Sequence, residues 1–212
     1  MKTNLILLAA GNSTRFKGNK IMHEFQGKPL GMHIIDKGTS VPFNSIILVT
    51  QYKEFAKLVN DKYNSISSEK IEAKFESASE CVGDKLFRIN IIINDEPNKG
   101  ISHSIKLGLE QCKDCDSVMF AVCDQPFITE KTMNGMIKAM KDTEKNIICA
   151  GDGDALGNPT LFHMKYREEL MKLEGDVGGK KVIKKLMGDT FIYQVEDVKE
   201  LIDFDTKESL VV

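Results

Sequence analysis

The sequence predicts an α/β fold: a single three-layer Rossmann-like domain with a mostly parallel sheet and helices on both faces. Two observations carry this prediction. Short unbroken runs of Ile, Leu and Val recur along the 212 residues, and amphipathic stretches separate them. Strands that are apolar without alternation are buried on both faces, which is typical of a parallel sheet covered by helices. A chain of this length fits one domain, residues 1–212.

The apolar runs give the expected strands, and the stretches between them give the expected helices. The strands are 4–9, 45–50, 89–94, 117–123 and 146–150. The helices are 29–39, 52–63, 102–111 and 129–140. Pro29 suits a first helical turn and Thr129 suits an N-cap. The methionines of the last helix recur at helical spacing, so we expect them to fill the core.

The remaining segments are less regular. A polar excursion covers 64–85, and after Gly157 we expect a short strand at 160–162. Helices at 165–173 and 177–187, a strand at 190–195 and a closing segment at 198–210 complete the chain.

Charge and cysteine content exclude several classes of protein. The formal net charge is −2, so no bulk field favours nucleic acid or an anionic membrane as a partner. No apolar run is long enough for a membrane span, and we expect a cytoplasmic protein. The five cysteines are an odd number, which does not suit a disulfide framework. Cys112 and Cys115 have C-x-x-C spacing without the context of a zinc or redox site.

A loop of small residues follows the first expected strand. It consists of Ala9, Ala10, Gly11, Asn12, Ser13, Thr14 and Arg15, with Lys20 shortly after. Its backbone N–H groups can approach phosphate oxygens, and Arg15 and Lys20 supply cations. The loop has neither Walker nor dinucleotide-binding spacing. The residues alone leave two interpretations open, a phosphate-binding loop and an ordinary tight turn with solvated charges.

Two further segments could contribute to the same site. Asp124 comes directly after the strand at 117–123, at the edge where open α/β sheets bind ligands and where a carboxylate can hold magnesium. It could equally cap the following turn. Gly100, Ser102 and Ser104 precede or begin a helix, where hydroxyls either cap the helix or contact a nucleotide.

Taken in order, these motifs resemble the MobA-like nucleotidyltransferase superfamily and, within it, the molybdenum cofactor cytidylyltransferases of the MocA type. The opening pattern LAAG-x-S-x-R-M-G-x-x-K is matched at the same spacing by Leu8, Ala9, Ala10, Gly11, Ser13, Arg15 and Lys20. Phe16 stands for the usual Met and Lys17 for the Gly, with Gly18 one place later. The resemblance implies a nucleotide-diphospho-sugar transferase-like fold and a loop that grips a nucleoside triphosphate.

The later motifs extend the resemblance to the end of the chain. The segment from Gly100 to Ile105 is similar to the G-M-S-x-S-L segment near the base and ribose, whereas the guanylyl-transferring branch tends to have G-P-L-A-G. Asp124 to Phe127 resembles the magnesium-binding D-x-P-F, and the residues around Asp205 resemble D-I-D-T. Acceptor-binding positions follow by resemblance at Gln125, Pro126, Asn158, Pro159, Asp176 and Gly178.

The resemblance implies transfer of CMP from CTP, or of GMP from GTP, to the terminal phosphate of the molybdopterin cofactor, with release of pyrophosphate. It implies Mg²⁺ on Asp124 and Asp205, the catalytic residues Arg15, Lys20 and Asp124, and a molybdoenzyme as the receiver of the product. A phosphate nucleophile is already ionised and needs no general base. Positioning and charge neutralisation are therefore the protein's expected contributions.

Two other functions remain open. One is a nucleotide-binding accessory protein of molybdoenzyme maturation that transfers nothing. The other is a nucleotidyltransferase for a different phosphorylated acceptor, such as a methylerythritol phosphate or a sugar phosphate, because one fold serves many acceptors. Release of pyrophosphate from CTP, GTP and UTP, tested separately, distinguishes them.

Overall fold

The computed structural model describes residues 1–11, 16, 18–64 and 88–204. Seven strands form one sheet in the order β5-β4-β1-β6-β8-β7-β9. Their bounds are β1 Thr3–Ala9, β4 Ser45–Thr50, β5 Ile89–Ile93, β6 Ser117–Val122, β7 Ile147–Asp152, β8 Ala155–His163 and β9 Thr190–Gln194. Among the described residues of this sheet, only the pairs that involve β8 are antiparallel. The prediction of a mostly parallel sheet is confirmed.

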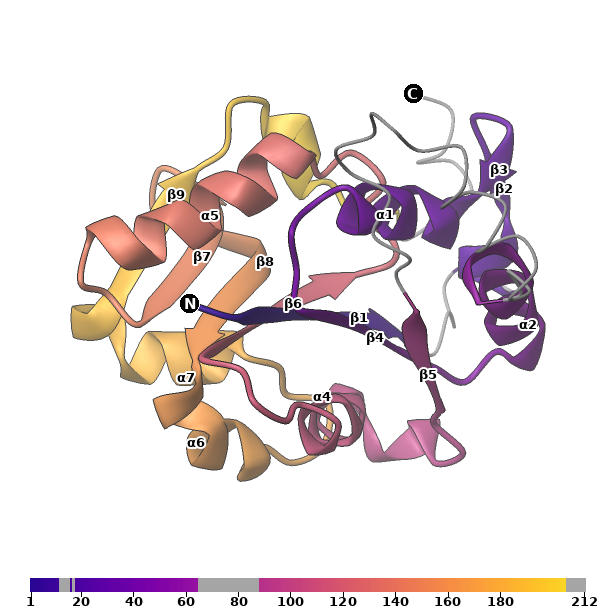
Figure 1. Cartoon of the computed structure of the whole chain (residues 1–212), viewed down its shortest axis with the longest axis horizontal. Helices are drawn as coiled ribbons and strands as arrows, with labels where there is room; N and C mark the ends of the chain where they lie inside the picture. Colours follow the sequence, from indigo (N-terminus) through magenta and orange to yellow (C-terminus); the bar gives the residue numbers. More distant parts are fainter. Residues whose placement is uncertain (12–15, 17, 65–87, 205–212) are drawn as a thin grey trace, which may run out of the picture.

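Helices cover both faces of this sheet and create three layers (Figure 1). One face carries α1 (Leu30–Thr39), α2 (Lys53–Tyr63) and α5 (Glu130–Asp142). The other carries α4 (Ile101–Glu110), α6 (Arg167–Met171) and α7 (Lys180–Lys185). Because side chains alternate along a strand, Leu5 and Leu7 of β1 enter the first core while Ile6 and Leu8 enter the second. Met133, Met136 and Met140 fill the first core, as expected.

Shorter elements connect these layers. They are the 3₁₀ turns η1 Lys20–Met22, η2 Pro97–Lys99, η3 Met164–Tyr166, η4 Met187–Asp189 and η5 Val198–Leu201, and the hairpin strands β2 Glu24–Phe25 and β3 Lys28–Pro29. The hairpin turns at Gln26 and Gly27, whose φ angles of 48° and 82° are the pair of positive values that a type I′ turn requires. This hairpin is absent from the elements that the sequence predicts.

The expected helices and strands occur with shifted ends. Pro29 lies at the N-cap of α1 and not in its first turn, whereas the Thr129 hydroxyl caps α5 by accepting from the Thr132 N–H at 3.1 Å. The helix expected at 165–173 is divided into η3 and α6. The one expected at 177–187 is reduced to α7, because Gly178 and Gly179 precede it and glycine is a poor helix former. Most of the polar excursion at 64–85 lies outside the described residues.

The largest error concerns β8. The sequence predicts only a short strand at 160–162, beginning after Gly157, Asn158 and Pro159, but β8 begins at Ala155 and pairs with both β6 and β7. The register of β8 with β7 shifts between Cys149 and Gly151. Gly157, Asn158 and Pro159 therefore belong to a bulge. A bulge tolerates the glycine and proline that resemble turn residues in the sequence.

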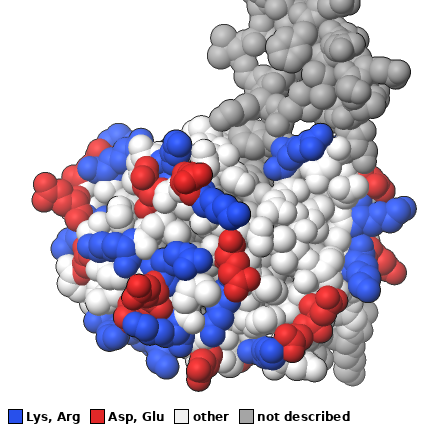
Figure 2. Space-filling view, turned by 60° about the horizontal axis from the view of Figure 1, so that its bottom comes forward, with Lys and Arg blue, Asp and Glu red and all other residues white. Residues whose placement is uncertain are grey.

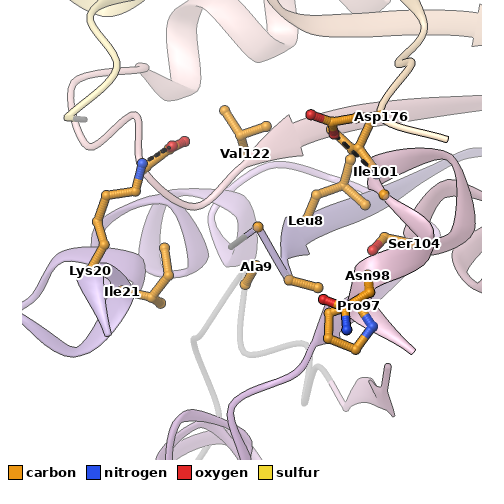
Figure 3. A pocket seen from close by; sticks show the side chains of 14 residues that line it. Leu8, Ala9, Lys20, Ile21, Pro97, Asn98, Ile101, Ser104, Val122 and Asp176 are labelled. Atoms are coloured by element: carbon orange, nitrogen blue, oxygen red, sulfur yellow. Dashed lines mark hydrogen bonds and ion pairs between the residues drawn. The ribbon is translucent and has the colours of Figure 1, made fainter. Parts of the chain in front are cut away.

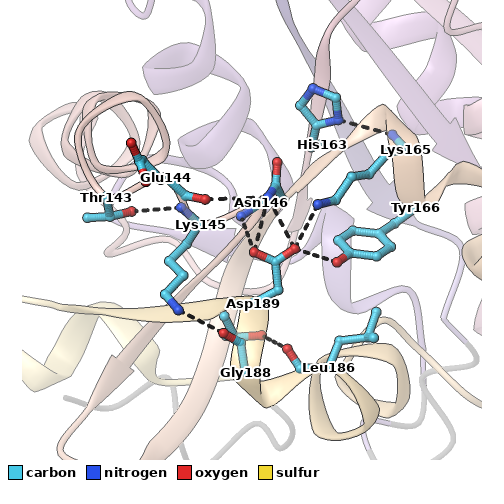
Figure 4. Close-up of polar contacts among 11 residues, drawn as sticks. Thr143, Glu144, Lys145, Asn146, His163, Lys165, Tyr166, Leu186, Gly188 and Asp189 are labelled. Carbon is cyan, nitrogen blue, oxygen red and sulfur yellow. Dashed lines mark hydrogen bonds and ion pairs between the residues drawn. The ribbon is translucent and has the colours of Figure 1, made fainter.

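A cluster of polar groups anchors the far edge of the sheet. Asp189, directly before β9, accepts hydrogen bonds from the N–H and the amide of Asn146, the Tyr166 hydroxyl and the Lys165 ammonium (Figure 4). Burial alone would raise the pKa of the Asp189 carboxyl, but these hydrogen bonds outweigh burial and hold that pKa well below its ordinary value. The cluster ties β9 to the start of β7 and to η3.

The surface over α4, α6 and α7 mixes both signs of charge. Figure 2 shows Lys and Arg side chains interspersed with Asp and Glu on the described part of this face. The described cysteines, Cys112, Cys115, Cys123 and Cys149, are free thiols. Among the described residues, no helix has both the length and the apolar character needed to cross a membrane.

Candidate active site

A cavity of about 490 Å³ opens where β1 and β6 end. Parallel neighbours finish at the same edge of the sheet, so the loops that follow them surround a common space. The cavity is lined by Leu8, Ala9, Ala10, Gly11, Lys20, Ile21, Pro97, Asn98, Gly100, Ile101, Ser104, Val122, Asp124 and Asp176. Lys20 and Ile21 lie on one side of it, and Pro97, Asn98 and Ser104 lie on the other (Figure 3).

Lys20 and Asp124 meet at this cavity. The Lys20 ammonium donates to Asp124 Oδ2 at 2.6 Å, and the Lys20 residue is only 9% exposed. Lys20 begins η1, whose N-cap Asn19 accepts from the Met22 N–H at 3.4 Å. The sequence placed both residues in one site although they are 104 positions apart. The structure brings them together as a charged pair at the edge of the sheet.

Backbone contacts hold the Asp124 segment in place. Leu8 O accepts from the Cys123 N–H at 3.0 Å, and Asp124 O accepts from the Phe204 N–H at 3.1 Å. The Lys37 ammonium of α1 donates to Pro126 O at 2.6 Å. Asp124 is therefore supported by β1, by α1 and by the C-terminal part of the described chain.

Aromatic packing attaches that C-terminal part to the same loop. The rings of Phe25, Phe127 and Phe204 lie with centroids 5.0 to 5.7 Å apart. Phe127 belongs to the D-x-P-F segment, and Phe204 is fully buried. The hairpin that carries Phe25 thus positions the segment after Asp124.

The second side of the cavity is built by the loop before α4. Asn94, which is buried, donates its amide to Ser104 Oγ at 3.0 Å and accepts from the Glu96 N–H at 2.9 Å. Ser102 and Ser104 are both buried, and only Ser104 lines the cavity. The network holds the loop from Glu96 to Gly100 against the end of β5.

Asp176 reaches this loop from a distant part of the chain. Its Oδ1 accepts from the Ile101 N–H at 3.4 Å (Figure 3). Gly175 O accepts from the Ser102 N–H at 3.3 Å. The carbonyl and the carboxylate therefore face the N-terminal N–H groups of α4. Gly100, with φ of 81°, allows the close approach, because a Cβ there would lie 2.4 Å from the Gly175 carbonyl.

The predicted nucleotide-binding residues are partly gathered here. Ala9, Ala10, Gly11, Lys20, Gly100 and Ser104 line the cavity, and Ser102 lies directly beside it in α4. Asn12, Ser13 and Arg15 of the first loop, and the second predicted metal ligand Asp205, lie outside the described residues.

The six predicted acceptor-binding residues are not gathered around this cavity. Only Asp176 lines it. Gln125 is 2% exposed and donates to Leu201 O at 3.3 Å, Pro126 accepts from Lys37, and Asn158 and Pro159 lie in β8. Gly178 lies before α7, and a Cβ added there would lie 3.8 Å from the Ile101 side chain. Their role toward an acceptor stays a prediction.

Several residues of the site escaped the sequence analysis. Ile21, Pro97 and Val122 line the cavity, while Gln51 and Tyr52 contact the first loop. Gln51 and Tyr52 directly follow the strand expected at 45–50, so the rule that pointed to Asp124 could have found them. Pro97, which precedes α4, has no comparable signal.

The sequence of this chain matches that of a known protein family. The family described as the MobA-like NTP transferase domain matches residues 5–190. The chain belongs to this family. The matched range contains Lys20, Asp124 and every residue of the cavity. The family fixes nucleotidyl transfer as the class of reaction and a nucleoside triphosphate as the class of substrate, and it leaves the particular nucleotide and acceptor open.

Curated relatives of this MobA-like chain are distant and longer. The bifunctional protein GlmU of Staphylococcus epidermidis is 23% identical over 150 residues, which cover 69% of this chain and 28% of GlmU. The chain thus spans less than a third of the length of that relative.

Solved structures share the fold at low identity. Rv0371c from Mycobacterium tuberculosis H37Rv has a TM-score of 0.71 and 18% identity, covering 98% of this chain and 95% of that one. A second structure of it, in complex with manganese, has a TM-score of 0.64 and 17% identity, covering 92% and 89%. Molybdopterin-guanine dinucleotide biosynthesis protein A from Archaeoglobus fulgidus has a TM-score of 0.63 and 15% identity, covering 98% and 94%. The MobA-like nucleotidyltransferase fold is therefore confirmed.

Proposed function

We propose that this chain transfers CMP from CTP to the terminal phosphate of the molybdopterin cofactor. An oxygen of the acceptor phosphate forms a bond to the α-phosphorus of CTP, the bond from that phosphorus to the bridging oxygen breaks, and pyrophosphate leaves. The observation that carries the proposal is the Lys20–Asp124 pair at the cavity. The ammonium of Lys20 suits the phosphates of a metal-bound triphosphate, and the carboxylate of Asp124, which follows β6, suits its metal ion.

Lys20 supplies the charge for the phosphates. Its ammonium lies on the side of the cavity opposite Ser104, and the N–H groups of Ala10 and Gly11 belong to the loop that lines the same space. Phosphoryl-type transfers need mainly orientation and neutralisation of charge, which these groups provide. Arg15, one of the positions matched to the family pattern, is the proposed second cation.

The donor set fits magnesium. Among the described residues, no group of three or more His, Cys, Asp or Glu side chains is arranged to hold a metal ion. Magnesium needs no such cage, because it is usually held by one or two carboxylates together with substrate phosphates and water. Asp124, with Asp205, would hold the ion. Bound there, magnesium neutralises charge on the phosphates. The manganese complex of Rv0371c is a further reason to expect a divalent ion here.

CTP is favoured over GTP by the segment from Gly100 to Ile105, which resembles the G-M-S-x-S-L of the cytidylyl-transferring branch. In this chain the segment begins α4 and contributes Gly100, Ile101 and Ser104 to the cavity. The molybdopterin acceptor is supported by the resemblance of the sequence motifs and by the shared fold of the Archaeoglobus protein.

The test is release of pyrophosphate from CTP, GTP or UTP, each with Mg²⁺ and molybdopterin cofactor. We expect release with CTP and little with the other two. Release only with a methylerythritol phosphate or a sugar phosphate in place of the cofactor would move the chain to another acceptor. Binding of CTP without release for any acceptor would instead identify an accessory protein.

A matched variant tests the role of Asp124. Asp124→Ala would remove the partner of the nearly buried Lys20 ammonium, so a loss of activity could reflect misfolding. Asp124→Asn keeps an oxygen that Lys20 can contact but is a much weaker ligand for magnesium. We expect Asp124→Asn to reduce turnover about 100-fold or more while the melting curve stays cooperative. Turnover near that of the unmodified protein would contradict the assignment.

A further inference from the structure

Side chains extend the contact between β1 and β4 beyond the point where their backbone ladder ends. The last paired residues are Ala9 and Thr50. There the buried Thr50 hydroxyl donates to Ala9 O at 3.1 Å. The same Thr50 oxygen accepts from the Tyr52 N–H at 3.1 Å, which fixes the backbone of Tyr52.

The next two side chains of this segment hold the next two carbonyls of the first loop. The Gln51 amide donates to Ala10 O and to Gly11 O, both at 3.2 Å. The Tyr52 hydroxyl donates to Gly11 O at 3.0 Å. Together with Thr50, three successive side chains bind three successive carbonyls.

This arrangement interrupts the alternation of a regular strand. Along β1, successive carbonyls point in turn to the two neighbouring strands: Leu8 O accepts from the Cys123 N–H beyond β6, and Ala9 O faces β4. Ala10 O would next return to the β6 side. Gln51 holds it on the β4 side instead, and Gly11 O lies there too.

The orientation of the carbonyls determines the orientation of the N–H groups. In a planar trans peptide the C=O and the following N–H point in opposite directions. The N–H groups of Ala10 and Gly11 belong to the peptides whose carbonyls, those of Ala9 and Ala10, face β4. Both N–H groups therefore point toward the β6 side, where Asp124 lies and the cavity opens. Successive N–H groups on one side form an anion-binding concavity.

We propose that Gln51 and Tyr52 are positioning residues for the triphosphate: by holding the carbonyls of Ala10 and Gly11, they aim the loop N–H groups at the phosphates. This inference rests on the proposed function, because it assumes that the ligand is a nucleoside triphosphate. It assigns the segment after β4, which lies outside the cavity lining, to substrate binding.

The test uses the full-length chain with Gln51→Met, which keeps the length of the side chain and its neutral charge but cannot donate. CTP binding, Michaelis constants and turnover are measured with Tyr52→Phe as the second variant. We expect Gln51→Met to weaken CTP binding roughly 10- to 100-fold and Tyr52→Phe roughly 3- to 10-fold, because Gly11 O keeps the Gln51 amide in the latter. The Michaelis constant for the acceptor should stay unchanged.

Gln111→Met is the matched control. Gln111 lies at the C-cap of α4 and is exposed, so losing its amide should change neither CTP binding nor turnover. The backbone amide signals of Ala10 and Gly11 provide an independent readout: in the unmodified protein they should shift on addition of inorganic tripolyphosphate, and in Gln51→Met they should shift much less.

The outcomes separate two failures. If the unmodified protein binds CTP and Gln51→Met binds it equally well, the positioning role is wrong and the proposed function stands. If the unmodified protein shows no response to CTP or to tripolyphosphate at Ala10 and Gly11, both are overturned. A loss of thermal stability in Gln51→Met with unchanged CTP affinity would reduce Gln51 to a structural contact.

Discussion

Replacing Gly100 by alanine should disrupt the junction between the loop before α4 and the segment at Gly175 and Asp176. Gly100 has φ of 81°, and a Cβ at this position would lie 2.4 Å from the carbonyl atoms of Gly175 and 2.6 Å from the nitrogen of Asp176. These are backbone atoms, so no rotation of a side chain relieves the overlap. The Gly175 segment must move by about 1 Å to restore an ordinary contact.

Two costs contribute to the loss of stability. A positive φ costs a residue with a Cβ about 1–2 kcal/mol. Forcing an extra carbon into a packed junction costs about 1–3 kcal/mol more. Gly153→Ala is the matched control, because Gly153 has φ of 56° but no atom within 4 Å of a new Cβ. It should therefore bear a backbone cost but no overlap, and the restriction of the unfolded chain affects both variants alike.

The difference between the two variants combines the overlap with the additional backbone strain at Gly100, whose φ of 81° and ψ of −179° lie in a region that essentially only glycine adopts. At about 2–4 °C per kcal/mol for a chain of this size, Gly100→Ala should melt roughly 2–12 °C below Gly153→Ala. CTP titration should also show weaker binding for Gly100→Ala alone, because Gly100 and Asp176 line the cavity and Gly153 does not. Equal melting temperatures and equal CTP affinities would refute the close approach of the two segments.

Three further predictions follow from named contacts. Lys20→Met should strengthen binding of bare Mn²⁺, because it frees Asp124 from its ion pair, and should weaken binding of metal-free CTP, because it removes a cation. A parallel fall of both affinities in calorimetric titrations would contradict this prediction. Glu200→Ala should lower the free energy of unfolding, measured in urea, by about 2–4 kcal/mol, because the buried Glu200 carboxylate accepts from the N–H and the hydroxyl of Thr129 at 2.9 and 3.0 Å. Glu200→Gln should lower it clearly less, because the amide oxygen of glutamine can still accept both hydrogen bonds. Asp189→Asn should destabilise the protein at pH 7 but progressively less as the pH falls below 3.8. A carboxyl whose pKa is lowered by folding stabilises the folded protein above its ordinary pKa, and this contribution is lost as the carboxyl is protonated. A stability difference between the variant and the unmodified protein that is independent of pH would exclude this role.

The parts of the fold that follow from local pattern could be predicted from the sequence. Unbroken apolar runs identified β1, β4, β5, β6 and β7 to within two residues at each end. Their common direction followed from burial on both faces. The meeting of Lys20 and Asp124 followed as well, because the carboxyl ends of β1 and β6 share an edge of the sheet.

The parts that depend on contacts between distant segments could not be predicted. Gly157 and Pro159 break the apolar pattern of β8, and only pairing with β6 and β7 makes that segment a strand. Asp176 was assigned to an acceptor by resemblance, and that role stays a prediction, but the contact of its carboxylate with the start of α4 was not predicted. That contact depends on the small volume of Gly100, and volume at one residue leaves no periodic signal in a sequence.

The charged pair at the cavity gives a physical reason why the proposed site would take a metal and a triphosphate together. Lys20 and Asp124 neutralise each other at 2.6 Å, so a bare cation must compete with the ammonium and a bare anion with the carboxylate. A metal–triphosphate complex offers both charges at once, which lets each side chain exchange its partner without leaving a nearly buried charge uncompensated. The pair therefore favours the complex over either component, and the opposite changes predicted for Lys20→Met express the same exchange.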